Sequence, residues 1–187
     1  RSANGFNMFA DISPTNYVLD SITIDTNSDS TSMSVRISSA VNFTIQNSYL
    51  INNASHAIAM FSTGTNIKII NNYISGSAGY GIRGQFTVVQ GNVVNGLATG
   101  IDTNGGNAPT IITNNTVYGN SNGIVVSTSA NTIVSNNQIY SNTNNGMIIF
   151  GAGVNVSNNS IYSNVTGINT QSATNLSITN NNIFSNS

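Results

Sequence analysis

The sequence predicts an all-β chain that folds as a right-handed parallel β-helix, a solenoid of roughly seven or eight coils with about 22 residues in each. One observation is a motif that recurs every 20 to 24 residues or so along the chain. Another is a set of short runs in which Ile, Val and Thr alternate with polar residues, which is typical of strands. The third is the lack of helix signals, since the 187 residues include no Glu and no helical spacing of Leu or Ala. The expected handedness follows from the rule for crossovers between parallel strands.

The motif is built on a residue pair, usually Asn-Asn, that is followed two positions later by an aliphatic residue. Asn tolerates the left-handed backbone conformation, and its amide can donate to and accept from identical neighbours above and below. We therefore expect a structural pair at one corner of every coil. The copies are Asn47-Ser48-Tyr49-Leu50, Asn71-Asn72-Tyr73-Ile74, Gly91-Asn92-Val93-Val94, Asn114-Asn115-Thr116-Val117, Asn136-Asn137-Gln138-Ile139, Asn158-Asn159-Ser160-Ile161 and Asn180-Asn181-Asn182-Ile183.

A small residue followed by an aliphatic comes eight or nine positions after most pairs, and an alternating strand precedes several of them, as at 43–45, 67–69 and 176–178. The small-plus-aliphatic steps are Ala57-Ile58, Gly81-Ile82, Gly100-Ile101, Gly123-Ile124, Gly146-Met147 and Gly167-Ile168. Aliphatic residues at equivalent positions should stack into a continuous core. The expected core contains Ile45, Ile69, Ile74, Ile82, Ile101, Val117, Ile124, Ile139, Ile161, Ile168 and Ile178.

The segments ITNNTVYGNSNGIVV, IVSNNQIYSNTNNGMII and NVSNNSIYSNVTGIN resemble the parallel β-helix repeat of the pectin-lyase-like superfamily. The resemblance covers roughly residues 16–187, so we expect one domain over 1–187 with an irregular lead-in at 1–15. It implies a right-handed β-helix. It does not define a function, because the superfamily contains polysaccharide lyases, epimerases, adhesins and structural proteins.

The composition excludes several classes of protein. Charged residues make up 5% of the chain and the formal net charge is −1, so the basic footprint of a nucleic-acid binder is missing. No apolar run approaches the length of a membrane span. Without Cys there is neither a disulfide framework nor a thiolate metal site. Because the chain opens on Arg1 rather than Met, we expect a leader or a preceding segment to have been removed.

Four residues are candidates for catalysis: Arg83, Asp102, Arg36 and His56. Alignment on the small-plus-aliphatic step predicts that Arg83 and Asp102 are vertical neighbours that form an ion pair. A surface salt bridge is one interpretation, and a catalytic Arg with a carboxylate partner is the other. His56, at the preceding corner, is either a hydrogen-bonded surface residue or a base. The full outward column is predicted to be Arg36, Ala59, Arg83, Asp102, Val125, Ile148 and Asn169.

In related lyases and epimerases, as the resemblance implies, carboxylates bind calcium or neutralise a uronate while Arg, Lys, His or Tyr moves the proton. All charged residues and the single His lie at or before Asp102, which weakens the enzymatic interpretation for the C-terminal half. Asp20, Asp25 and Asp29 could form a low-affinity calcium site, but no Gly and Glu complete a known loop pattern. We expect no other metal and no cofactor.

An aromatic column is predicted on the outside of the C-terminal coils, with an Asn column beside it. Rings beside amides can form a platform for a sugar, since sugar faces stack on rings and hydroxyl groups bond to amides. The alternative is that the rings stack on one another and shield the corner. The carbohydrate-binding candidates are Tyr118, Tyr140, Tyr162, Phe184, Asn120, Asn142 and Asn164.

Val125, Ile148 and Phe150 are predicted to point outward, and both solenoid ends lack a charged or helical cap. Exposed apolar columns and open sheet edges favour self-association or a covering chain. Asn-x-Ser/Thr motifs permit glycosylation of a secreted protein, although glycans at Asn114 and Asn158 would disrupt the expected Asn stack. The remaining glycosylation candidates are Asn42, Asn53, Asn155, Asn164 and Asn175.

Taken together, these features favour an extracellular or cell-surface structural solenoid. We expect it to assemble through its ends or through an exposed apolar face, with a polysaccharide as a further partner. The alternative is a polysaccharide lyase or epimerase, or a fragment of one, with its site near Arg83 and Asp102. The scarcity of ionisable groups favours the structural interpretation over the enzymatic one.

Overall fold

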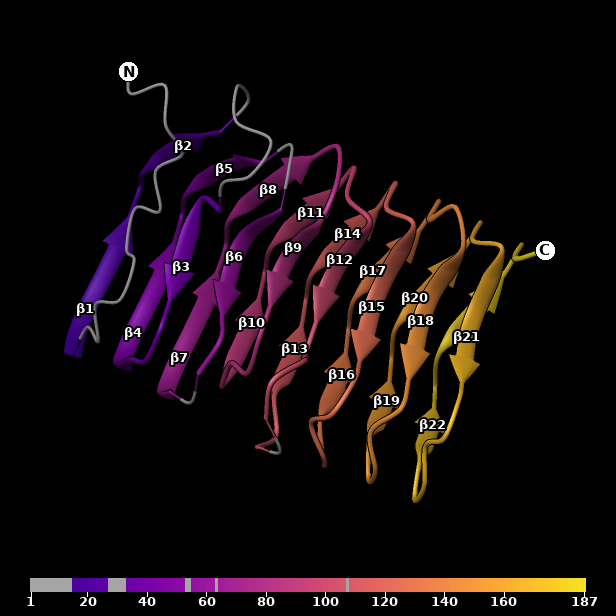
Figure 1. Cartoon of the computed structure of the whole chain (residues 1–187). Coiled ribbons are helices and arrows are strands. Elements are labelled where there is room, and N and C mark those ends of the chain that lie inside the picture. The colour runs from indigo at the N-terminus through magenta and orange to yellow at the C-terminus, as the bar shows by residue number, and fades with distance from the viewer. Residues whose placement is uncertain (1–14, 27–32, 53–54, 63, 107) are drawn as a thin grey trace.

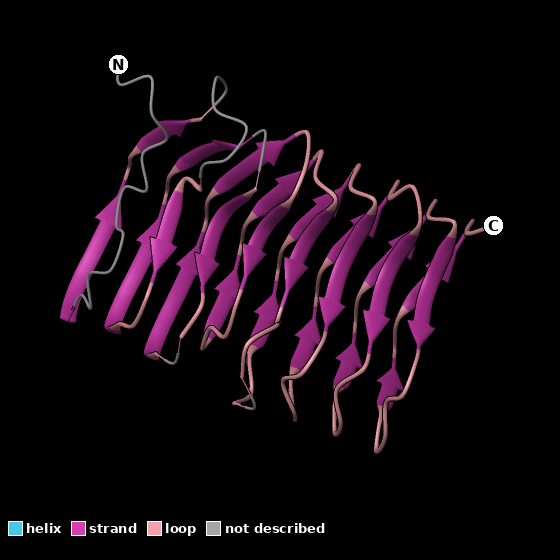
Figure 2. Cartoon of the chain, in the orientation of Figure 1, coloured by secondary structure: helices cyan, strands magenta, loops and turns pink. Residues whose placement is uncertain are grey.

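The computed structural model describes residues 15–26, 33–52, 55–62, 64–106 and 108–187. Within these ranges the chain consists of strands, turns and loops, with no helix. The strands stack coil upon coil into an elongated solenoid that begins at β1 and ends at β23 (Figures 1 and 2). The expected lead-in lies outside the described residues except for Thr15, and so do Asp29 and Asn53.

Each coil contributes one strand to each of three parallel sheets, except that the last coil adds no strand to the third. Sheet A contains, in spatial order, β1 (Thr15–Asp20), β4 (Val41–Gln46), β7 (Thr65–Ile70), β10 (Val88–Gln90), β13 (Ile111–Thr113), β16 (Ile133–Ser135), β19 (Asn155–Ser157) and β22 (Ser177–Thr179). Sheet B contains β2 (Thr23–Asp25), β5 (Tyr49–Asn52), β8 (Tyr73–Gly76), β11 (Val93–Asn95), β14 (Thr116–Tyr118), β17 (Gln138–Tyr140), β20 (Ser160–Tyr162) and β23 (Asn182–Phe184). Sheet C contains β3 (Val35–Ile37), β6 (His56–Met60), β9 (Tyr80–Arg83), β12 (Thr99–Asp102), β15 (Asn122–Val126), β18 (Asn145–Ile149) and β21 (Thr166–Thr170).

The core is a set of aliphatic ladders that run along the solenoid axis. In sheet B, for example, Val117, Ile139 and Ile161 are register partners 22 residues apart, as the repeat predicts. Nine of the eleven expected core residues are buried, and Ile168 is partly buried. Ile178 was expected in the core but is 42% exposed, because its strand, β22, is the last in sheet A and has no strand stacked beyond it.

The Asn pair forms the corner between sheets A and B, and its two members have different tasks. The first has a positive φ, as in Asn114 (56°), Asn136 (57°) and Asn158 (58°). The second is buried and hydrogen-bonded in a ladder. Asn137 Nδ2, for example, donates to Asn159 Oδ1 at 2.9 Å and to Ile112 O at 3.0 Å. The ladder consists of Asn72, Asn92, Asn115, Asn137, Asn159 and Asn181.

A second ladder fills the corner between sheets B and C, and it corrects one prediction. Asn120, Asn142 and Asn164 were expected to lie outside, beside the aromatic column. Instead their side chains are 1–2% exposed, and each amide donates to the next Asn and to a backbone carbonyl. Such an uncharged amide ladder satisfies buried backbone groups at every coil. These three residues therefore cannot contact a sugar, and Asn164 is too buried to carry a glycan.

The other glycosylation motifs lie differently. Asn114 and Asn158 were expected in the ladder but are exposed, because the ladder uses the second residue of the pair. Asn155 and Asn175 are also exposed. Asn42 is exposed too, although its amide joins an outer row by donating to Asn16 and accepting from Asn66. Glycosylation at these accessible positions stays a prediction.

The small residue of each step is required by the close approach of successive coils. A Cβ atom on Gly81 would lie 2.5 Å from the backbone oxygen of Gly100, and one on Gly123 would lie 2.4 Å from that of Gly146. Both contacts are shorter than van der Waals distance, so only a minimal side chain fits. At this step two consecutive residues face inward. The chain then resumes its alternation and presents the next residue, Arg83 in β9, to the outside of sheet C.

Candidate functional site

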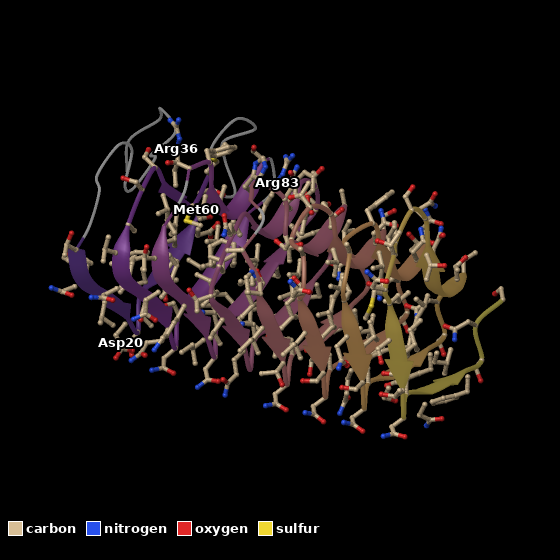
Figure 3. The ribbon with its side chains drawn as sticks, turned by 90° about the horizontal axis from the view of Figure 1, so that it is seen from below. Asp20, Arg36, Met60 and Arg83 are labelled. Carbon is tan, nitrogen blue, oxygen red and sulfur yellow. The ribbon has the colours of Figure 1, made fainter. Side chains whose placement is uncertain are left out.

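The outer face of sheet C carries the column that the sequence alignment of coils predicts. Backbone registers pair each member with the next, from β3 through to β21. The order along the axis is Arg36, Ala59, Arg83, Asp102, Val125, Ile148 and Asn169. Figure 3 shows Arg36 and Arg83 at one edge of the solenoid and Asp20 at the opposite edge.

Arg83 makes contacts with three side chains at the centre of this face. Its Nε lies 3.6 Å from Asp102 Oδ2, and its Nη1 lies 3.2 Å from His56 Nε2. Its guanidinium carbon is 4.3 Å from the centre of the Tyr80 ring, which is a cation–π distance. The predicted ion pair is present, and the guanidinium is held from three sides.

His56 is buried against aromatic rings. Its imidazole stacks on Tyr80 with centroids 5.0 Å apart and meets the edge of Phe61 at 5.7 Å. Burial, assisted by the Arg83 charge, lowers the pKa of His56 from 6.5 to about 4, so the ring is neutral at neutral pH. Because a guanidinium only donates, Nε2 is the acceptor and Nδ1 donates to Ser55 Oγ at 2.6 Å.

Asp102 is 5% exposed and accepts a hydrogen bond of 2.6 Å from Ser127 Oγ at Oδ1. Burial raises the pKa of Asp102 above its ordinary value of 3.8, although Ser127, Arg83 and the backbone at Asn104 each act to lower it. The carboxyl group is therefore poised closer to protonation than an exposed Asp.

Arg36 extends the group toward the N-terminal coils. Its guanidinium lies 5.5 Å from the ring centre of Phe61, which in turn contacts His56. Side chains from four successive strands of sheet C thus form one continuous set. We call it the sheet C cluster, and its members are Arg36, His56, Phe61, Tyr80, Arg83 and Asp102.

The predicted aromatic column is present, but its rings stack on one another. Tyr118 and Tyr140 have centroids 5.1 Å apart with planes at 4°, and the Tyr140–Tyr162 and Tyr162–Phe184 pairs are similar. Burial and the neighbouring phenols of Tyr73 and Tyr140 raise the pKa of Tyr118. Each ring therefore covers a face of its neighbour, which favours the stabilising stack over the sugar platform. Carbohydrate binding at the ring residues stays a prediction.

The expected apolar column is also only partly exposed. Val125 is 9% exposed, and Ile148 is half-buried. The two are register partners in the central column of sheet C. Only Phe150, which follows β18, is exposed among the three, at 44%. One exposed ring does not form an apolar docking column.

The acidic residues do not assemble into a calcium site within the described ranges. Asp20 ends β1 in sheet A, and its carboxylate accepts hydrogen bonds from Gln46, Asn47 and Ser21, which lower the pKa of Asp20. Asp25 ends β2, in sheet B. No cluster of three or more His, Asp or Glu ligands occurs among the described residues.

Comparisons with known proteins agree with this architecture. A family model described as "Right handed beta helix region" matches residues 99–187. The A-module of the Azotobacter vinelandii mannuronan C-5 epimerase AlgE4 superposes with a TM-score of 0.77 over 87% of this chain, at 18% sequence identity. The chain is a right-handed parallel β-helix protein. This is the fold of the pectin-lyase-like superfamily, and at the level of fold the resemblance carried by the repeat segments is confirmed.

The β-helix spans half of the length of that epimerase module. A search among curated proteins gave no match. The described residues of the β-helix include no helix that could cross a membrane.

Alignment of the coils predicted the backbone placement of Arg36, Arg83 and Asp102 in the β-helix, but it missed Tyr80, Phe61 and Ser127. Tyr80 is the register partner of His56, and each lies three residues before the member of the outward column on its strand. The alignment of coils could therefore have located Tyr80. Phe61 and Ser127 lie in turns beyond strand ends, where coil lengths differ and the alignment carries no signal.

Proposed function

We propose that the chain acts on a uronate polysaccharide by removing the proton next to the sugar carboxylate, the step that lyases and epimerases share. The observation that carries the proposal is the convergence of charge. Seven described residues are Asp, Arg, Lys or His, and four of them lie on the outer face of sheet C. The other three, Asp20, Asp25 and Lys68, lie on sheets A and B.

Arg83 is suited to bind the carboxylate of a uronate, because a planar guanidinium can donate two parallel hydrogen bonds to it. The side chain is 29% exposed, so a ligand can reach it. Neutralising the carboxylate acidifies the C5 proton and stabilises the charge that develops there. Asp102, through its ion pair with Arg83, orients the guanidinium for this contact.

His56 is the proposed base. It is neutral at neutral pH because its pKa is lowered to about 4. In the free protein Nε2 accepts a hydrogen bond from Arg83, and this bond breaks when the guanidinium turns to the sugar carboxylate, which frees Nε2 to take the C5 proton. The C5–H bond breaks, the proton moves to Nε2 and the electron pair enters the carboxylate. Tyr80 is stacked on His56 with the ring centres 5.0 Å apart, which leaves no room for a sugar between them, so the proton for the opposite face comes from solvent. Reprotonation on the opposite face gives the C5 epimer. If instead the C4–O bond breaks, a C4=C5 double bond forms and the leaving oxygen takes the proton.

The substrate class has support from the comparison. The superposed module belongs to an enzyme named for epimerising mannuronan, a polymer of uronate. Since the identity is 18% and this chain spans half of that module, the likeness concerns the fold, and the proposal rests on the sheet C cluster.

Product analysis tests the proposal. The chain is incubated with polymannuronate and with polygalacturonate, and ultraviolet absorbance reports the double bond while proton NMR reports C5 epimers. We expect one of these products, at least a hundredfold less of it with Arg83→Gln, and no change with Lys68→Gln, which alters a cation on sheet A. The absence of both products with wild-type protein overturns the proposal.

A structural role is the second candidate, and one observation favours it. Two apolar residues of sheet A, Ile111 and Ile133, are register partners on adjacent strands and are each at least 40% exposed. We propose that a second copy of the chain packs against this face, in an extracellular setting that suits a surface rich in amides and hydroxyls. Light scattering over a range of concentrations tests this, with dimers expected. A monomer throughout, or dimers unaffected by Ile133→Asp, contradicts it.

A further inference from the structure

Arg36 lies on the same outward column as Arg83, two strands away, with only Ala59 between them. Ala59 is fully buried, and the rings of Phe61 and His56 lie between the two guanidinium groups. Both Arg residues lie at the same edge of the solenoid in Figure 3. An extended ligand that crosses the exposed Phe61 ring can therefore contact both of them.

The two guanidinium groups differ in how they are paired. Arg83 has Asp102 and His56 as partners. Arg36 is oriented by the Phe61 ring, but none of the described carboxylates forms an ion pair with it. Its Nε is buried and has no hydrogen-bond acceptor among the described residues. A buried donor without an acceptor is costly. Since Arg36 as a whole is partly exposed, an anion can reach the guanidinium group and supply acceptors that the free protein lacks.

The spacing indicates the kind of anion. Two strand spacings of a parallel sheet amount to about 10 Å, the length of about two sugars in an extended chain. In an extended homopolymer of uronate, carboxylates on alternate sugars can face the same side. Arg83 and Arg36 are therefore spaced for the carboxylates of sugars n and n+2 of one chain.

We propose that Arg36 is a second carboxylate-binding subsite, so that the sheet C cluster selects runs of at least three consecutive uronate residues. This inference rests on the proposed function and adds its substrate selectivity. The uronate run extends from Arg83 toward β3. In the other direction the column continues with the carboxyl group of Asp102 and then with the uncharged Val125 and Ile148, which offer a carboxylate no partner.

Isothermal titration calorimetry with oligomannuronates and oligogalacturonates of two and six residues tests the inference without requiring turnover. Wild-type protein should bind a hexamer more tightly than the matching dimer. Arg36→Gln should weaken hexamer binding about tenfold and leave dimer binding unchanged, as expected for loss of one charge-assisted contact. The hexamer affinity of Arg36→Lys should lie between those of the wild type and Arg36→Gln. Lys68→Gln should bind both oligomers as the wild type does.

The outcomes separate the two proposals. If wild-type protein binds neither hexamer, the proposed function is overturned and the subsite with it. If it binds a hexamer and Arg36→Gln binds that hexamer equally well, the subsite is wrong and the proposed function stands. A loss of dimer binding as well, with an unchanged circular dichroism spectrum, places Arg36 at the first carboxylate and also contradicts the inference.

Discussion

Asp102 and Arg83 are register partners on β12 and β9, and their side chains form the ion pair that links these strands, with Nε 3.6 Å from Oδ2. The guanidinium then continues to His56 on β6. Charged groups on sheet C therefore influence one another across coils, although they are far apart in the sequence. The protonation of each member affects its neighbours, and the stability of the N-terminal coils should depend on pH.

The first prediction concerns His56. In the folded protein the pKa of His56 is about 4, against 6.5 when it is exposed, so between these values the unfolded chain binds more protons. The free energy of unfolding should consequently fall as pH decreases from about 6.5 to 4. The raised pKa of Asp102 acts in the opposite direction as pH falls toward 3.8 and offsets part of the loss. Urea unfolding at several pH values measures the net slope.

The control for this prediction is His56→Gln, which keeps a hydrogen-bonding side chain and removes the titration. Its unfolding free energy should change less between pH 6.5 and 4 than that of the wild type. Equal slopes for the two proteins would show that His56 titrates normally in the folded state.

The second prediction concerns the Asn ladder. Replacing Asn137 by Ala leaves Ile112 O and the Asn115 N–H without their Asn137 partner inside the corner, whereas Asn159 Oδ1 still accepts from the backbone N–H of residue 137. The cost should be about 3 kcal/mol, given the usual penalty for buried unsatisfied groups. Thermal and urea unfolding measure it, with exposed Asn155→Ala as the control, expected within about 0.5 kcal/mol of wild type. If Asn137→Ala lowered the free energy of unfolding by much less than this, water would have to replace the amide in the corner.

The third prediction concerns the aromatic stack. Tyr140 has a ring on each side, at 5.1 and 5.0 Å, so Tyr140→Ala removes two stacking contacts. Destabilisation should be about 1–3 kcal/mol, from about 0.5–1.5 for each pair. Binding of oligosaccharides should not change, because the ring faces are already covered. Phe150→Ala, which removes an exposed ring, is the control and should be close to neutral. If Tyr140→Ala bound oligosaccharides more weakly than the wild type, the interpretation of the column as a sugar platform would be supported instead.

The fold could be predicted because equivalent positions in successive coils carry similar residues, so a role assigned in one coil can be checked in the next. The left-handed Asn at 114, 136 and 158, the inward Ile and Val ladders and the column from Arg36 to Asn169 all follow from one alignment. The alignment did not show whether the side chains of Asn120 and its equivalents point inward or outward. Strand alternation would point the Asn120 side chain outward if β14 continued. Instead the chain turns a corner after β14, and the amide points inward.

The site was harder to predict than the fold for a similar reason. Periodicity places Cα atoms, but it does not say which side chains meet across coils. Whether Tyr118 and Tyr140 offer their faces or cover each other depends on side-chain rotamers. The contact between Arg83 and His56 joins different columns, which no alignment of equivalent positions displays.

Proton exchange at C5 in deuterium oxide tests the central claim, that the sheet C cluster removes the proton next to a uronate carboxylate, most directly. Polymannuronate and polygalacturonate are incubated with the chain in D₂O, and mass spectrometry with NMR measures deuterium at C5 in both epimers and unsaturated products. The account predicts deuterium incorporation or elimination with wild-type protein and with Lys68→Gln, and a loss of at least a hundredfold with His56→Gln. Neither exchange nor elimination with wild-type protein, or equal rates with His56→Gln, would contradict it.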